Sequence, residues 1–163
     1  MEENLLLKIY SCGELAILRE HKVDNETAIE WFEEEKDYER LLSKGLITVM
    51  GYRGFPIERE EDIIGGKKLF VRVTEKGAEL ARVIISLKIS KLKIDEEIIQ
   101  MLKSLRNNFG YIPFTDEVKR IAKYLFDLGI VFKAMKFDDH GRYVGDMLCV
   151  PDELLVSSNY SSL

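Results

Sequence analysis

The chain is poor in the residues that build metal sites and disulfide frameworks. It contains two cysteines and two histidines in 163 residues. Cys12 and Cys149 stand near opposite ends of the sequence, and neither is at zinc-ligand or redox spacing from another cysteine or a histidine. We therefore expect no disulfide framework, no metal and no cofactor, and we interpret both cysteines as buried thiols.

Long apolar runs and a basic leader are also missing. The apolar run at 83–85 is interrupted by charge within a few residues, well below the ~18 residues needed to span a bilayer. The first residues, Met1-Glu2-Glu3-Asn4, lack the basic region of a secretory signal. We expect a cytoplasmic protein with no membrane partner.

Basic residues do not dominate the composition. The 24 Lys and Arg residues are outnumbered by 29 Asp and Glu residues, which gives a formal net charge of −5. This balance excludes a protein that coats DNA with a uniformly basic surface. Apolar residues make up 46% of the chain, enough for a core in one average domain or in two small ones. Many Glu, Lys and Ile residues beside a single glutamine, Gln100, are typical of a thermophile.

Hydrophobic periodicity and turn residues predict alternating helices and strands in the first half. The predicted elements are two short helices between 4 and 20, a helix at 24–44, strands at 46–50 and 68–73 that form a hairpin, and a helix at 75–89. Gly45 is the predicted C-cap of the helix before the hairpin, and Thr74 is the N-cap of the helix after it. We expect the last helix to turn an apolar stripe inward, made of Leu80, Ala81, Ile84, Ile85 and Leu87.

The second half repeats this order. The predicted elements are a helix capped by Asp95 and ended by Gly110, a helix from Thr115 to Gly129, strands at 130–137 and 143–150, and a short helix from Pro151 to Val156. The Ser-rich tail at 157–163 is predicted to be frayed.

Two short motifs carry a resemblance to a known family. The step from Leu41 to Gly45, the hairpin after it and the run Thr74-Glu75-Lys76-Gly77 resemble the recognition-helix end, wing and following helix of winged helix-turn-helix regulators. Leu125 to Gly129 repeats the leucine-to-glycine step, and Pro151-Asp152 stands where the capped turn is expected. The resemblance implies an α+β, mainly helical fold of tandem winged-helix modules, each a three-helix unit with a β-hairpin wing. We place module 1, with a long wing, at 1–88 and module 2 at 89–163.

The acidic residues are concentrated in the predicted helix before the first hairpin. Residues 24–39 hold eight acidic residues against one basic residue, a balance of −7 that repels a polyanion. Residues 86–136 hold ten basic residues against six acidic ones, a balance of +4. If DNA is bound, we expect the second module to bind it.

The resemblance and the charge pattern predict a non-enzymatic transcription regulator. It would bind the backbone of double-stranded DNA as a homodimer, with the helices at 75–89 and 4–20 in the dimer interface. The predicted DNA-binding residues are Lys119, Arg120, Lys123 and Tyr124 on a helix, Lys133, Lys136 and Arg142 on the second wing, and Arg53, Lys67 and Lys68 on the first wing. The same lysines also fit an ordinary solvated helix face.

An alternative is a degenerate winged-helix module that binds a basic protein and has no role on DNA. Its candidate anchor residues are Trp31, Glu33, Glu34, Glu35 and Tyr38, on the acidic helix. This helix also fits a solvated scaffold face. A small-ligand sensor is a further option, for which the sequence does not place a pocket.

Motifs for catalysis are missing. No serine stands in a Gly-x-Ser-x-Gly turn, and His21 and His140 are isolated in the sequence. The run Gly65-Gly66-Lys67-Lys68 lacks the hydroxyl residue that follows the lysine of a phosphate-binding loop. We do not expect an enzyme.

Overall fold

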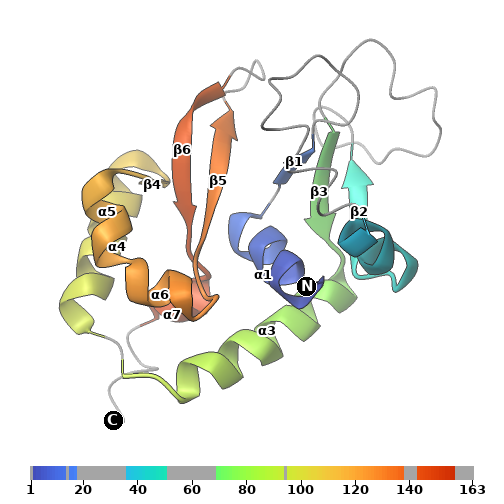
Figure 1. Cartoon of the computed structure of the whole chain (residues 1–163), viewed down its shortest axis with the longest axis horizontal. Coiled ribbons are helices and arrows are strands. Elements are labelled where there is room, and N and C mark those ends of the chain that lie inside the picture. Colours follow the sequence, from blue (N-terminus) through green and yellow to red (C-terminus); the bar gives the residue numbers. More distant parts are fainter. Residues whose placement is uncertain are drawn as a thin grey trace. The chain divides into compact units, whose positions relative to one another are not determined.

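The computed structural model describes residues 2–13, 15–17, 36–50, 69–93, 95–137 and 143–156. Over these residues the fold is α+β and mainly helical, with two small antiparallel sheets (Figure 1). The chain forms two compact units, Met1–Glu79 and Leu80–Leu163. The boundary therefore falls inside one helix, ahead of the join that the sequence predicts between 88 and 89.

Unit 1 contains a three-stranded sheet and the helices that accompany it. Its elements are α1 (Glu2–Cys12), β1 (Leu15–Ile17), a helical segment at 36–43, β2 (Ile47–Met50), β3 (Leu69–Val73) and the start of α3 (Glu75–Ser90). The strand order is β1-β3-β2, and both neighbours of β3 are antiparallel to it. Helix α1 packs against β3 and buries an apolar face made of Leu5, Leu6, Leu7 and Ile9.

Unit 2 has the same order of elements after the end of α3. Its elements are α4 (Glu96–Phe109), β4 (Ile112–Pro113), α5 (Asp116–Ile121), α6 (Lys123–Asp127), β5 (Phe132–Phe137), β6 (Tyr143–Cys149) and α7 (Asp152–Leu155). The strand order is β4-β6-β5, again antiparallel. In each unit the strand that comes last in the chain therefore lies in the middle of the sheet.

The helix that precedes each hairpin ends in the same hydrogen-bonded turn. The N–H of Gly45 donates to the Leu42 carbonyl at 3.0 Å, and the next N–H, of Leu46, donates five residues back to Leu41 at 3.0 Å. Gly129 and Ile130 repeat both bonds, at 2.9 and 3.1 Å. The two glycines have φ +70° and +68°, the left-handed geometry of a Schellman cap, so the predicted end of each helix at its glycine is confirmed.

In unit 1, the turn from β3 into α3 is hydrogen-bonded to the Schellman cap at Gly45. Thr74 Oγ1 donates to the Gly45 carbonyl at 2.6 Å and accepts from the N–H of Gly77 at 3.1 Å, which makes Thr74 the predicted N-cap. Gly77 lies directly on the backbone of Leu46, because a Cβ at Gly77 would be 1.9 Å from the Leu46 carbonyl oxygen. The start of α3 therefore requires glycine at this position.

The corresponding turn in unit 2 differs in its chemistry. Pro151 is the N-cap of α7 and has no N–H to give to the preceding loop. Leu154 stands three residues on, where α3 has Gly77, and its side chain is fully buried. Helix α7 has four residues and packs against α4, where Arg106 and Asp152 form an ion pair of 2.7 Å.

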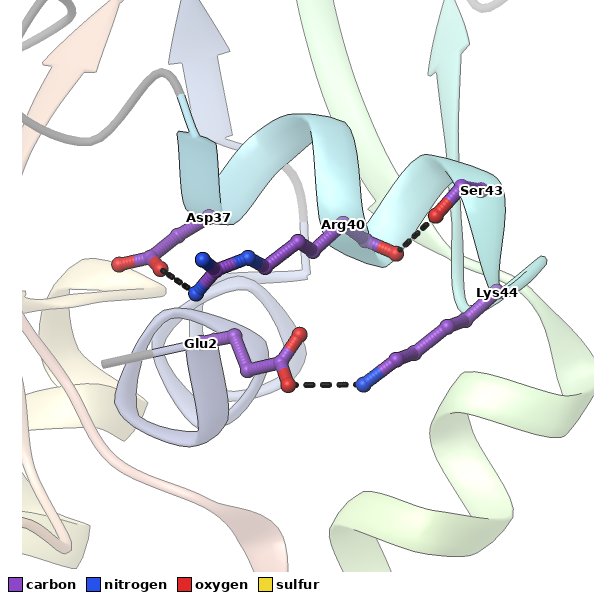
Figure 2. A network of polar contacts seen from close by, with 5 residues as sticks. All are labelled: Glu2, Asp37, Arg40, Ser43 and Lys44. Carbon is purple, nitrogen blue, oxygen red and sulfur yellow. Dashed lines mark hydrogen bonds and ion pairs between the residues drawn. The ribbon is translucent and has the colours of Figure 1, made fainter.

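Polar side chains join the two helices of unit 1 at their ends (Figure 2). Glu2 Oε1 accepts from Lys44 Nζ at 2.7 Å, while Arg40 lies 4.0 Å from Asp37 and accepts at its carbonyl from Ser43 Oγ at 2.9 Å. Because Lys44 is well exposed to solvent, we attribute at most about 1 kcal/mol to its ion pair. Lys44 and Arg40 therefore both have acidic partners within unit 1.

Several predicted elements need correction. Residues 15–17 form a strand, so the second short helix predicted before residue 20 is wrong there. The predicted helix from Thr115 to Gly129 is broken into α5 and α6 at Ala122. The inward stripe on α3 is also wrong in part, since Leu80 and Leu87 are 42% and 58% exposed. Neither Cys12 nor Cys149 is a free thiol, so the prediction that both are buried thiols is wrong.

Candidate nucleic-acid interface

The helix that carries the predicted DNA-binding lysines is built from two short segments. Thr115 begins it, with its Oγ1 accepting from the N–H of Val118 at 3.2 Å. The break at Ala122 keeps helical hydrogen bonds on both sides, since Ala122 donates to Val118 at 2.8 Å and Phe126 donates to Ala122 at 2.9 Å. Helices α5 and α6 therefore act as one broken helix (Figure 1).

One side of this broken helix is apolar and the other is basic. Val118, Ala122 and Leu125 are buried. The opposite side, which we call the basic face, consists of the exposed residues Lys119, Arg120, Lys123 and Tyr124. The sequence predicted these four residues together, and the structure brings them onto a single exposed surface.

The cations of the basic face have no intramolecular partners among the residues that the structure describes. Lys119, Arg120 and Lys123 form neither a hydrogen bond nor an ion pair with any of them. The acidic residues Asp116 and Glu117 occupy the first turn of α5, where the helix dipole favours negative charge. The positive charge therefore lies along the middle of the broken helix and not at its N-terminus.

The two wing lysines predicted to bind DNA are held by partners within unit 2. Lys133 Nζ lies 3.5 Å from Asp146 Oδ2 and 5.4 Å from the ring centroid of Phe114. Lys136 Nζ lies 4.5 Å from the ring centroid of Tyr111. Sequence reasoning missed these aromatic partners, because a strand pairing across the sheet brings them to the lysines. Lys133 thus has an acidic partner, whereas Lys136 has an aromatic ring and no acidic partner among the described residues.

The pairing of β5 with β6 is irregular near Lys136. The pairing of β5 with β6 shifts register between Lys136 and Phe137, and Gly145, which pairs with Lys136, has φ +140°. Such an irregularity increases the local twist and turns the end of a hairpin away from the sheet plane. The local twist of these two strands therefore depends on this glycine.

The other predicted site residues are not placed on this surface. Arg53, Lys67, Lys68 and Arg142 lie outside the described residues, as do Trp31, Glu33, Glu34 and Glu35. Tyr38 is only 4% exposed, so it is a core residue of unit 1 and does not offer its ring to a partner.

Lysines of α3 complete the caps of both units. Lys76 Nζ donates to the carbonyl of Lys44 at 3.2 Å. Lys88 Nζ lies 3.4 and 3.3 Å from the carbonyls of Leu128 and Gly129 at the end of α6. A cation at the C-terminal end of a helix is favoured by the helix dipole, so these lysines have structural partners.

Comparisons of the chain with protein-family models, curated proteins and solved structures gave no match. In the part of the chain that the structure describes, no helix is both long and apolar enough to cross a membrane. The same residues contain no group of three or more His, Cys, Asp or Glu side chains placed to hold a metal ion.

Proposed function

We propose that the protein binds double-stranded DNA through unit 2, with the basic face against the phosphate backbone. The observation that carries this proposal is the set of three exposed cations, Lys119, Arg120 and Lys123, without partners among the described residues. Cations that are not neutralised within the protein release counterions from DNA when they reach phosphates, and this release drives binding.

The proposed mode of binding is broadside contact with the duplex. The acidic first turn of α5 repels phosphates, so the broken helix does not enter a groove by its N-terminus. Of the exposed side chains on the broken helix, Arg120 is suited to a guanine edge, whereas the lysines suit phosphates. We therefore expect affinity for duplexes of any sequence, with a modest preference where Arg120 reaches a base.

Tandem winged-helix modules are the architecture that we propose for the two units. The shared strand order and the shared Schellman cap before each hairpin support two copies of one module. Under this proposal β5 and β6 form the wing of the DNA-binding module. The protein then acts as a transcription regulator without catalytic activity.

A homodimer through α3 is part of the same proposal. Leu80, Val83 and Leu87 recur at helical spacing on α3 and are 42% to 58% exposed. A second copy of this helix would remove the three side chains from water. Dimer formation would also present two basic faces to one duplex, which raises the affinity without new contacts.

Salt dependence is the test of the backbone-contact proposal. Fluorescence anisotropy with a labelled mixed-sequence duplex should show binding at low salt and a steady loss of affinity as salt is added. Three phosphate contacts for each protein chain predict a slope of about −3 in log K against log salt concentration. Absence of binding at about 50 mM salt, or affinity that salt does not change, would contradict the proposal.

A further inference from the structure

A second surface of unit 2 lies at the turn between α4 and β4. Its residues are not on α5 or α6, the two helices that carry the basic face. Phe109, the last residue of α4, is 55% exposed. Gly110 then takes left-handed geometry at φ +71°, and Tyr111 follows with its ring centroid 6.2 Å from that of Phe109. The rings are tilted by 52°, so Tyr111 does not cover the exposed face of Phe109 by stacking.

Strand β5 adds a cation to this aromatic pair. Lys136 Nζ lies 4.5 Å from the centroid of the Tyr111 ring, within the range of a cation–π contact. The ring orients the ammonium group but accepts none of its N–H groups in a conventional hydrogen bond. Lys136 forms no hydrogen bond or ion pair with any residue that the structure describes, so three donors remain for an anion.

Two exposed amides border the same turn. Asn107 and Asn108 precede Phe109 and are both exposed. Each amide offers a donor and an acceptor, the complement of a nucleobase edge. The aromatic pair and the amides thus lie within one short segment, and Lys136 reaches that segment from β5 through its contact with the Tyr111 ring.

We propose that Asn107, Asn108, Phe109, Tyr111 and Lys136 form a site for single-stranded nucleic acid. An unpaired base stacks on Phe109, the amides contact its edge, and Lys136 contacts the adjoining phosphate. Bases inside a duplex are stacked on both faces and do not reach such a ring. The lysine favours this anionic ligand over a neutral sugar, which would need only the ring and the amides.

This site does not rest on the proposed duplex function, because its residues lie on α4, in the turn before β4 and on β5, and none of them belongs to the basic face. The basic face lies on α5 and α6. Unit 2 would thus carry a duplex-binding face and a single-strand site on different elements.

The test uses the full chain and a labelled single-stranded oligonucleotide of about 12 mixed nucleotides, with a blunt-ended duplex without unpaired bases measured in parallel. Phe109→Ala should weaken single-strand binding by about 5- to 150-fold, the range that loss of one stacked base implies, and leave duplex binding unchanged. Phe109→Trp should retain single-strand binding because it keeps the aromatic face. Lys136→Ala should weaken single-strand binding and reduce its salt dependence.

Tyr124→Ala is the matched control, since Tyr124 is a similarly exposed aromatic residue on the basic face. This control should leave single-strand binding unchanged. The proposal fails if the wild-type chain does not bind the single strand at low salt. It also fails if Phe109→Ala binds the single strand as tightly as wild type while circular dichroism shows an intact fold.

Discussion

Replacement of Gly77 by alanine is expected to destabilise the protein by about 3 kcal/mol or more. The added methyl carbon would lie 1.9 Å from the Leu46 carbonyl oxygen and 2.9 Å from its carbonyl carbon. Both atoms are backbone and the oxygen accepts from the N–H of Thr74 at 3.0 Å, so they do not move aside as the end of a flexible side chain does. Relief of the clash requires α3 to shift away from the cap that Thr74 holds.

The clash with Leu46 predicts that Gly77→Ala lowers stability, whereas helix propensity alone predicts that it raises stability. Alanine in place of glycine within a helix ordinarily stabilises it by roughly 1 kcal/mol. Ser86→Ala, at an exposed position on the same helix, is the control and should leave stability unchanged or slightly raised. Urea denaturation followed by circular dichroism measures both variants. A Gly77→Ala protein as stable as wild type would show that α3 does not start against Leu46.

Reversal of charge on the basic face should nearly abolish duplex binding. The triple variant Lys119→Glu, Arg120→Glu and Lys123→Glu removes three proposed phosphate contacts and adds three repulsive charges. We expect affinity to fall on the order of 10³-fold at about 0.1 M salt, because each lost contact alone removes nearly a factor of ten. The positions are exposed, so the fold should persist.

A matched control separates local contact from net charge. Lys91→Glu with Lys93→Glu reverses two exposed lysines that follow α3 and lie outside the basic face. This variant should lose at most a few-fold in affinity through long-range repulsion, which salt screens. Equal losses in the two variants would mean that the basic face is not a contact surface.

The helix ends were predictable because their signals are local. Asp95 accepts from the N–H of Glu97 at 2.9 Å and Thr115 caps α5, each as its side chain and position predict. Gly45 and Gly129 end their helices because left-handed geometry strongly favours glycine. Such features depend on a few neighbouring residues and survive in any tertiary context.

The short first strand of each sheet was not predictable in the same way. β1 has three residues and β4 two, too few for an alternating pattern to be recognised. They are strands because they pair with β3 and β6, far along the chain. The contact of Gly77 with Leu46 is likewise tertiary, and the sequence alone gives only a glycine in a predicted helix.

The basic face could be predicted from helical periodicity. Which of the predicted DNA-binding lysines have partners within the protein could not be predicted. The spacing of Lys119 and Lys123 places them on one side of any helix. That Lys133 is paired with Asp146, and that Lys136 lies over Tyr111, follows from the register of β4, β5 and β6. Among the described residues of unit 2 predicted to bind duplex DNA, Lys119, Arg120 and Lys123 are therefore the cations without a side-chain partner.

The most direct test of duplex binding by the basic face is an NMR titration of the isotope-labelled chain with an unlabelled mixed-sequence duplex. The predicted result is a set of amide shifts that clusters at 115–128, with little change at 36–43. Shifts confined to 36–43, or no shifts at low salt, would contradict binding through the basic face.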